Sequence, residues 1–301
     1  MPPDPIPDRL RPPLQACASG TVPANIGLLR LLIEAQSHRE ADEALAASSR
    51  AEADASARQR LDAARRLLDE NPQAFGLVAS VLRDVEHHGT ASDAEGGVAH
   101  WAGAFDRMAR AAPEGAVALY ALGNPRLLEQ ATREVVDYLR DRTLVGSASH
   151  VLEIGCGIGR FVEALAPDVA QVTGLDIAPA MIDEARRRCA GHANVVLRVS
   201  SGHDLAPVED ESVDLVLAAD VFPYLVHAGP DLVEKHLHEA RRVLRRGGSL
   251  VILNYSYRDD PAQDEADLRR LAGLHGLTPV KTGERPFSLW DAAVFHLARK
   301  A

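Results

Sequence analysis

The chain has 301 residues, 46% of them hydrophobic and 25% charged, and a net charge of −10. This composition is typical of a globular protein with one large domain, or with a domain and a smaller companion. No apolar run approaches the roughly 20 residues of a membrane-spanning helix, so no membrane partner is expected. The acidic balance argues against nucleic acid as the main partner, because phosphate binding needs clustered cations.

The first segment, residues 1–20, is proline-rich and predicts a disordered tail without an apolar signal core. The three cysteines (17, 156 and 189) have no ligand-like spacing, and no cluster of histidines, cysteines and acids predicts a metal site. We therefore expect reduced thiols in a cytoplasmic, bacterial protein that binds no metal.

A small helical N-terminal domain is expected over residues 21–92. ANIGLLRLLIEA has apolar residues at helical spacing, and a second such pattern follows the Asn-Pro at 71–72. Residues 40–69 predict one long, mostly solvated helix or two shorter ones. The segment 88–97, HGTASDAEGG, predicts a linker. A substrate lid, a dimer contact, a partner-docking module and a simple helical cap all fit this domain.

A glycine turn after a buried strand is the main functional signal. Residues 151–160 read VLEIGCGIGR, in which an apolar strand leads into glycines at 155, 157 and 159, and a helix follows from Arg160. The next apolar run, VTGLD, ends at Asp176. Glycines allow a sharp turn and a close ligand approach, and an acid at this position can bind ribose hydroxyls.

Two details favour one nucleotide over another. Arg160 occupies the position where the dinucleotide fingerprint has its third glycine, and Glu153 is an acid on an otherwise apolar strand. A carboxylate there repels a pyrophosphate and attracts an ammonium group. S-adenosylmethionine, with adenosine at one end and an amino acid at the other, fits both observations.

Four ordered motifs together resemble the class I S-adenosylmethionine-dependent methyltransferases, of the type 11/25-like kind. They are the E-x-G-x-G-x-G turn, the acid of GLDIAP, the strand DLVLAAD at 214–220, and LHEARRVLRRGGSLVIL at 237–253. The resemblance covers residues 98–301. It implies an α/β, Rossmann-like, doubly wound sheet of seven strands in the order 3-2-1-4-5-7-6, with the last strand antiparallel. It also implies a helix, a tight Gly-Gly turn and the fifth strand over 237–253.

The resemblance also implies the cofactor residues. Glu153 should face the methionine ammonium, the turn of Gly155, Gly157 and Gly159 should pass under the ligand, and Asp176 should hold the ribose. The remaining expected contacts are Ile177 on the adenine, the loop residues Ser201, Gly202 and His203 at its edge, and Asp220 near the methyl group. Ser201 stands where many relatives have Asp, and Arg246 where many have Pro before the Gly-Gly turn.

The expected acceptor is a small molecule with a hydroxyl, amine or carboxylate, methylated by in-line displacement. His227 is the candidate general base, and Asp220 a candidate for binding an acceptor hydroxyl or amine. The candidates for the acceptor pocket are Trp101, Tyr120, Tyr224, Tyr255, Tyr257 and Arg258. The sequence leaves the acceptor atom and the oligomeric state open.

Two other functions stay open at this stage. The chain can be a non-catalytic S-adenosylmethionine-binding module whose N-terminal helices dock a partner. It can also be a nicotinamide-dependent oxidoreductase, although Glu153 and Arg160 count against this. The chain has only three lysines and no Tyr-x-x-x-Lys pair, so a short-chain-dehydrogenase proton relay has no obvious residue.

Overall fold

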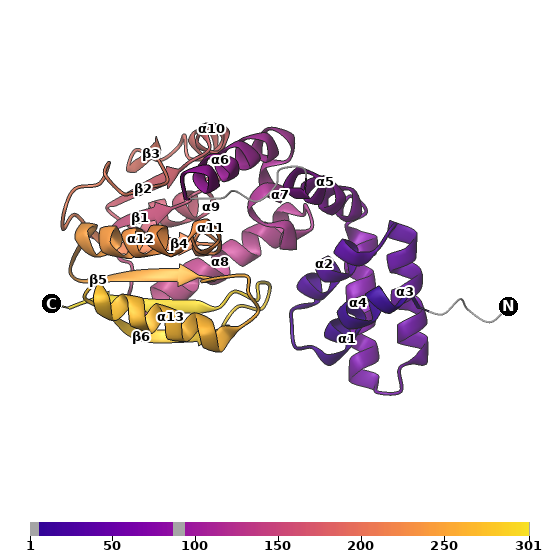
Figure 1. Cartoon of the computed structure of the whole chain (residues 1–301). Helices are drawn as coiled ribbons and strands as arrows, with labels where there is room; N and C mark the ends of the chain where they lie inside the picture. Colours follow the sequence, from indigo (N-terminus) through magenta and orange to yellow (C-terminus); the bar gives the residue numbers. More distant parts are fainter. Residues whose placement is uncertain (1–5, 87–93, 301) are drawn as a thin grey trace. The chain divides into compact units, whose positions relative to one another are not determined.

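The computed structural model describes residues 6–86 and 94–300, which fold into two compact units (Figure 1). One unit comprises Met1–His87, Glu114–Ala131 and Phe287–Asp291. The other comprises His88–Pro113, Thr132–Pro286 and Ala292–Ala301. The first unit thus draws two segments from the region expected to form the methyltransferase domain. Residues 88–93 of the expected linker lie outside the described residues, and its last residues belong to a helix, α6 (Ala94–Ala111).

The first unit is built from helices. They are η1 (Asp8–Leu10), α1 (Arg11–Ser19), α2 (Ala24–Glu34), α3 (His38–Ala51), α4 (Ala55–Glu70), α5 (Ala74–Glu86), α7 (Pro113–Val117, which begins one residue before the unit) and η2 (Leu119–Ala121). The stretch expected to hold one helix or two holds α3 and α4. Ser37 and Asp54 begin them, because their side chains accept hydrogen bonds from the backbone of Glu40 and Ala57. Leucines of α1, α2, α3 and α4 form the core of this unit.

Helix α1 differs from the disordered tail expected over residues 1–20. Leu10, Leu14 and Cys17 recur at helical spacing and are buried in the core of the first unit. Two prolines lie in the first turn of the helix, where a missing N–H costs nothing, and Gly20 ends the helix with a positive φ. The proline content that predicted disorder is therefore compatible with a docked helix.

The second unit contains one sheet of seven strands. They are β1 (His150–Ile154), β2 (Gln171–Asp176), β3 (Val195–Val199), β4 (Val213–Ala219), β5 (Leu244–Leu253), β6 (Leu277–Glu284) and β7 (Val294–Arg299). Their order is β3-β2-β1-β4-β5-β7-β6. The first five strands pair in parallel, and β7 is antiparallel to both β5 and β6. The predicted sheet and strand order are confirmed.

Helices cover both faces of this sheet. The helices α9 (Arg160–Leu165) and α10 (Pro179–Arg188) pack against β2, whereas α12 (Pro230–Val243) and α13 (Pro261–Leu274) pack against β5 and β6 (Figure 1). A short helix, α11 (Phe222–Ala228), contacts α12 and α6. Another helix is α8 (Pro125–Asp141), whose residues up to Ala131 belong to the first unit and whose residues from Thr132 belong to the second. Burial of alternate residues of β1, β4 and β5 against α12 forms the main core.

The Gly-Gly turn expected between helix and fifth strand lies instead inside β5. Helix α12 ends at Val243 and the strand begins at once with Leu244. Leu244 pairs with Val213 and Ser249 pairs with Leu215, so the intervening residues form a bulge. Gly247 has φ +79°, a conformation that suits such an irregularity.

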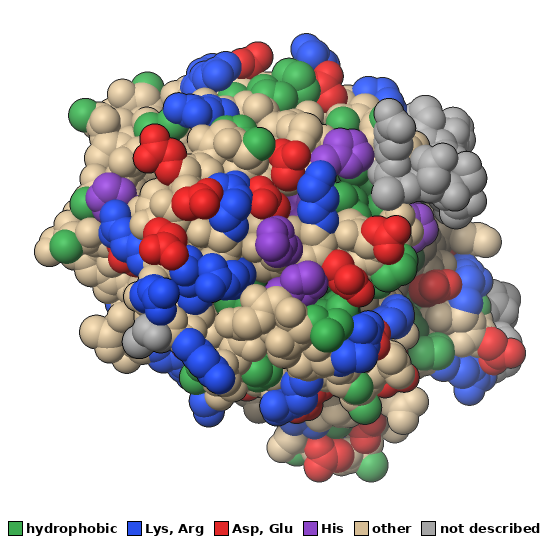
Figure 2. Space-filling model, turned by 60° about the vertical axis from the view of Figure 1, so that its left-hand side comes forward, with side chains coloured by type: hydrophobic (Ala, Val, Ile, Leu, Met, Phe, Trp, Pro, Cys, Tyr) green, Lys and Arg blue, Asp and Glu red, His purple; other side chains and the backbone are tan. Residues whose placement is uncertain are grey.

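Acidic and basic side chains are interspersed over the face of the molecule drawn in Figure 2. Many of them form ion pairs, such as Arg242 with Asp210 and Arg245 with Asp214. Within residues 6–86 and 94–300, no helix is both long enough and apolar enough to cross a membrane. The same residues hold no group of three or more His, Cys, Asp or Glu side chains that could bind a metal ion.

Candidate cofactor and acceptor site

The glycine turn joins the carboxyl end of β1 to α9 at the centre of the sheet. Gly155 has φ +65°, and a Cβ added to it would lie 2.3 Å from Val221 Cγ2. Gly159 has φ +77°, and its added Cβ would lie 2.9 Å from Ala185 Cβ on α10. Only glycine fits either position, so the turn lies tightly between α10 and the segment that follows β4.

Glu153 is an enclosed carboxylate on β1, with 1% of its surface exposed. Burial raises its pKa well above the ordinary value, while Arg160 and a hydrogen bond from the Val162 backbone lower it. Its Oε2 atom has no hydrogen-bond partner among the described residues. A buried carboxylate oxygen without a hydrogen-bond partner is a good partner for a cationic ligand group.

Asp176 is a second buried carboxylate, at the carboxyl end of β2. Its two oxygens accept hydrogen bonds from the backbone N–H groups of Gly157 (2.8 Å) and Ala178 (2.9 Å). Burial raises its pKa, and these backbone donors lower it. Asp176 thereby fixes the glycine turn relative to β2, and its charge also raises the pKa of Glu153. The sequence-predicted pair of acids is thus close enough to interact.

The residues expected around an adenine lie on the loops after β2 and β3. A Cβ added to Gly202 would lie 2.7 Å from Ile177 Cγ2 and 2.8 Å from Val98 Cγ1, so these two loops meet beside α6. The Ser201 hydroxyl accepts a hydrogen bond from the backbone N–H of His203 at 3.2 Å. It also lies 3.4 Å from Asp204. Ser201 therefore organises its own loop.

A strained pair ends strands β4 and β5. Asp220 and Asn254 both have positive φ, +55° and +63°, although neither is glycine. The Asn254 amide donates to the Asp220 carboxylate at 2.7 Å and accepts from the Ala293 N–H at 3.0 Å. Backbone strain of this kind persists only where the surroundings enforce it, and it is frequent at functional sites. Sequence analysis missed Asn254; its position directly after an apolar strand that is parallel to β4 was the available signal.

Four aromatic side chains form a group around Tyr224, and two of them, Tyr224 and Tyr257, interact with Asp220. Tyr224 of α11 lies between Trp101 and Phe105 of α6, with ring centroids 4.7 and 5.2 Å away, and Tyr257 lies 6.1 Å from it. The Tyr257 hydroxyl forms hydrogen bonds with Asp220 and Tyr224. Of the expected pocket residues, Trp101, Tyr224 and Tyr257 are thus brought together. Phe105, for which packing was expected, joins them.

The structure gives the other expected pocket residues different contacts. Tyr120 belongs to the first unit, where its ring stacks on that of Trp290 at 5.3 Å. Tyr255 is buried in the sheet core beside Phe222 and Phe295. The Arg258 guanidinium forms ion pairs with two acids of α13, Asp264 and Asp267.

His227, the candidate base, is an exposed residue near the end of α11. Its ring centroid lies 5.9 Å from that of Trp101, so it borders the aromatic group.

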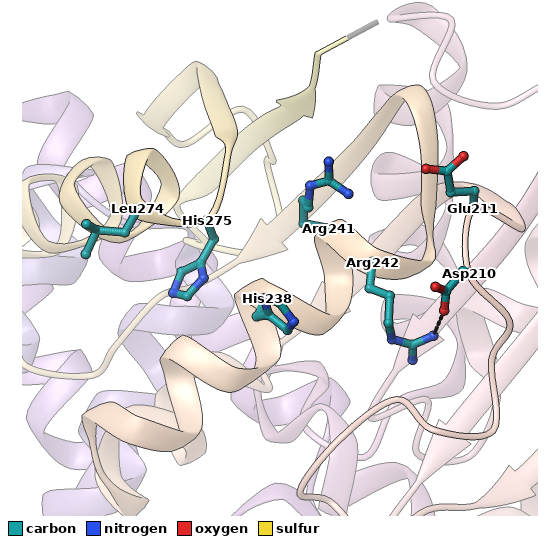
Figure 3. Close-up of a pocket in the computed structure, with 7 residues that line it drawn as sticks. All are labelled: Asp210, Glu211, His238, Arg241, Arg242, Leu274 and His275. Atoms are coloured by element: carbon teal, nitrogen blue, oxygen red, sulfur yellow. Dashed lines mark hydrogen bonds and ion pairs between the residues drawn. The ribbon is translucent and has the colours of Figure 1, made fainter.

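A separate hollow of about 310 Å³ lies at the opposite edge of the sheet (Figure 3). Its lining comes from the loop before β4 and from the last turns of α12 and α13: Asp210, Glu211, His238, Arg241, Arg242, Leu274 and His275. Because β1 and β4 are parallel, this hollow is at the amino edge and the glycine turn is at the carboxyl edge. The acids here pair with arginines, Asp210 with Arg242 and Glu211 with Arg299.

A central parallel sheet with a glycine turn and two buried acids at its carboxyl edge is the arrangement of a Rossmann-like fold. Residues 152–252 match the family model described as a methyltransferase domain. This segment of the chain is therefore similar to methyltransferase domains.

Two curated bacterial relatives resemble this part of the chain. A malonyl-[acyl-carrier protein] O-methyltransferase from Paenibacillus sp. is 35% identical over 165 residues, which are 50% of this chain and 58% of the relative. A demethylmenaquinone methyltransferase from Tropheryma whipplei is 34% identical over 113 residues, 38% of this chain and 44% of the relative. The chain spans about half the length of the curated relatives it matches.

A solved structure with the same fold is phosphoethanolamine N-methyltransferase 1 from Haemonchus contortus, in complex with phosphoethanolamine and S-adenosylhomocysteine. The TM-score is 0.53 at 18% identity, over 71% of this chain and 51% of that one. At this identity, the likeness supports the fold alone.

Proposed function

We propose that the chain is an enzyme that transfers a methyl group from S-adenosylmethionine to a small-molecule acceptor. The observation that carries the proposal is the enclosed Glu153 carboxylate, whose Oε2 has no hydrogen-bond partner among the described residues and which lies next to the glycine turn. A buried acid is costly unless a ligand uses it, and the amino-acid end of S-adenosylmethionine offers an ammonium group.

The residues at the carboxyl edge fit this ligand. Glu153 would bind the ammonium, and the backbone of residues 155–159 would pass under the ligand, where a Cβ has no room. Asp176 would hold the ribose hydroxyls, with Ile177 against the adenine. The Ser201–His203 loop meets Ile177 through Gly202 and would close the adenine side.

S-adenosylmethionine supplies an electrophilic methyl group on a sulfonium, so the protein mainly has to align the acceptor and exclude water. Asp220 would position the acceptor at the end of β4, and the rings of Trp101, Phe105 and Tyr224 would exclude water beside it. His227, exposed at the border of these rings, is the proposed general base for an acceptor that arrives protonated.

The proposed domain organisation is a helical N-terminal domain, expected over residues 21–92 and preceded by α1 in the same core, and a methyltransferase domain over 98–301. Residues 114–131 and 287–291 of the latter range belong to the first unit. A non-catalytic module that binds S-adenosylmethionine and docks a partner through its N-terminal helices is the alternative. The methyltransferase family match counts against the nicotinamide-dependent oxidoreductase.

Calorimetric titration of the full chain with S-adenosylmethionine, S-adenosylhomocysteine and NAD tests the proposal. We expect both sulfur ligands to bind, NAD not to bind, and Asp176→Ala to abolish binding. Glu209→Gln, an exposed acid on the loop before β4, is the control and should bind normally. Binding of NAD alone would overturn the cofactor assignment. Normal cofactor binding with no homocysteine release from any of a broad set of acceptors would favour the non-catalytic module.

A further inference from the structure

The hollow at the amino edge of the sheet lies opposite the glycine turn, away from the residues proposed for methyl transfer (Figure 3). Its volume of about 310 Å³ is large enough for a small organic molecule. The ends of α12 and α13 contribute two guanidinium groups and two imidazoles to its lining, and the loop before β4 contributes two carboxylates. The partners of these groups show which of them are available to a ligand.

Both carboxylates of the lining are engaged by arginines. Asp210 forms an ion pair with Arg242 at 2.6 Å, and Glu211 forms one with the buried Arg299. Arg242 also pairs with Glu239 of α12, which is outside the lining. A cationic ligand would have to displace one of these arginines, and the described residues hold no group that could bind a metal ion.

The Arg241 guanidinium differs from that of Arg242. Within residues 6–86 and 94–300 it has no hydrogen bond and no ion pair, and only the Arg241 carbonyl is engaged. Its side chain lies beside the turn that follows α13, since a Cβ added to Gly276 would lie 3.8 Å from the Arg241 Nε atom. A full positive charge without a protein partner thus lines the hollow.

Two imidazoles lie next to this guanidinium. His275 extends from the end of α13 toward His238 of α12 (Figure 3), and their ring centroids are 6.0 Å apart. The His275 Nε2 atom is buried without a hydrogen-bond partner among the described residues, and the His238 ring has no hydrogen bond to them either. Both rings therefore have unused hydrogen-bonding capacity beside the hollow.

Cations in the last turn of a helix often bind its unpaired carbonyl groups, but in α12 these groups already have partners. The Arg299 guanidinium donates to the carbonyl oxygens of Arg241 and Leu244. The backbone N–H groups of Glu211 and Ser212 donate to the two carbonyls between them, at 3.0 and 2.9 Å. The end of α12 therefore does not need the Arg241 side chain or the imidazole one turn before it.

We propose that the hollow binds a phosphate monoester, whose phosphate group is held by Arg241, His238 and His275. A guanidinium presents parallel N–H groups to two phosphate oxygens, and imidazole N–H groups reach a third. Donors from two helices suit a tetrahedral group with three free oxygens better than a planar carboxylate, which has two. Leu274, 67% exposed at the end of α13, offers an apolar contact for the carbon part of the ester. The site does not depend on the proposed methyltransferase function.

Four small probes test the class of ligand by calorimetric titration of the full chain at low salt. Phenyl phosphate carries the proposed group, phenylacetate carries a carboxylate, benzyl alcohol is neutral, and inorganic phosphate lacks the carbon part. We expect phenyl phosphate to bind at least tenfold more tightly than phenylacetate, and benzyl alcohol not to bind measurably. Inorganic phosphate should bind several-fold more weakly than phenyl phosphate, because it makes no contact with Leu274.

Variants of the lining locate the binding. Arg241→Gln should weaken phenyl phosphate binding at least tenfold, and Arg241→Lys should retain more of the affinity because it keeps the charge. His238→Ala and His275→Ala should each weaken binding several-fold. The matched control is Arg246→Gln, which should change the affinity less than twofold. Arg246 is an exposed arginine in the bulge of β5, without an ion pair among the described residues and outside the lining.

Equal affinity for phenyl phosphate and phenylacetate, or binding of neither, would overturn the proposal. A loss in Arg246→Gln as large as that in Arg241→Gln would also overturn it, because it would show a general attraction of anions to this edge. Thermal unfolding shows whether each variant is folded. If Arg241→Gln is not, unchanged affinity in both histidine variants overturns the site. No titration includes S-adenosylhomocysteine, so a failure of the proposed function is distinguishable from a failure of this site.

Discussion

At the amino edge of the parallel strands, Asp214 accepts hydrogen bonds from the His150 backbone at 2.8 Å and from Arg245 at 2.7 Å. At the carboxyl edge, the Glu153 Oε2 has no partner among the described residues, and Asp220 lies on strained backbone. A hydrogen-bonded and ion-paired acid such as Asp214 stabilises the fold. A buried acid with an unpaired oxygen, or one on strained backbone, reduces the stability of the fold, and it persists at a ligand site because the ligand uses it.

Two glycines with positive φ, one at each edge of the parallel strands, offer the sharpest test of the difference between an edge with paired acids and the proposed cofactor-binding edge. Gly155→Ala at the carboxyl edge places a Cβ 2.3 Å from Val221, so the glycine turn must shift. We expect S-adenosylhomocysteine affinity to fall by about a hundredfold or more, because a displacement near 1 Å in a site has effects of this size. Calorimetric titration measures it.

Gly247→Ala at the amino edge is the matched control. Gly247 has φ +79°, but an added Cβ meets nothing within 4 Å. The variant should lose about 1–2 kcal/mol of stability from backbone strain alone and bind the cofactor normally. If both variants lose affinity equally, the two edges are not functionally distinct.

The candidate base gives the next largest effect. His227→Ala is expected to reduce the turnover rate more than tenfold and to leave cofactor affinity intact, because removal of a general base affects the proton transfer alone. Steady-state kinetics with an acceptor identified by homocysteine release measures it. Glu209→Gln, the exposed acid on the loop before β4, is a control that should leave turnover unchanged. A His227→Ala enzyme with full activity would end the base hypothesis.

The sequence predicted the sheet well because each parallel strand carries a local signal. Short apolar runs separated by helical patterns determine the strands, and the glycine motif identifies the first of them. The acceptor pocket was harder to predict from the sequence. Tyr255 and Tyr257 are two residues apart, and only the structure shows that Tyr255 is buried in the core while Tyr257 is exposed. The sequence signal at Asn254 is only its position directly after an apolar strand, because its role depends on contact with Asp220 at the end of another strand. Helix α1 was missed because its proline content outweighed the spacing of Leu10, Leu14 and Cys17.

Glu153 itself gives the smallest and most specific effect. Its pKa is raised in the folded protein, so the folded state holds its proton more tightly than the unfolded chain does. The wild-type protein without ligand should therefore lose stability as the pH rises from the ordinary value of 4.5 through the raised pKa. Glu153→Gln lacks this loss, and we expect it to be more stable at neutral pH by about 1 kcal/mol, or roughly 2–4 °C in Tm.

The same variant should bind S-adenosylhomocysteine roughly tenfold more weakly, because one charge-assisted hydrogen bond is removed. An ammonium group beside Glu153 favours the charged carboxylate, so ligand binding should release a proton in the wild type, at pH values between the ordinary value of 4.5 and the raised pKa, and not in Glu153→Gln. Calorimetry in buffers of different ionisation enthalpy measures this proton. A variant that is less stable than the wild type, with unchanged affinity and proton release, would make Glu153 a structural acid like Asp214. The contrast between the two edges would then rest on Asp220 alone.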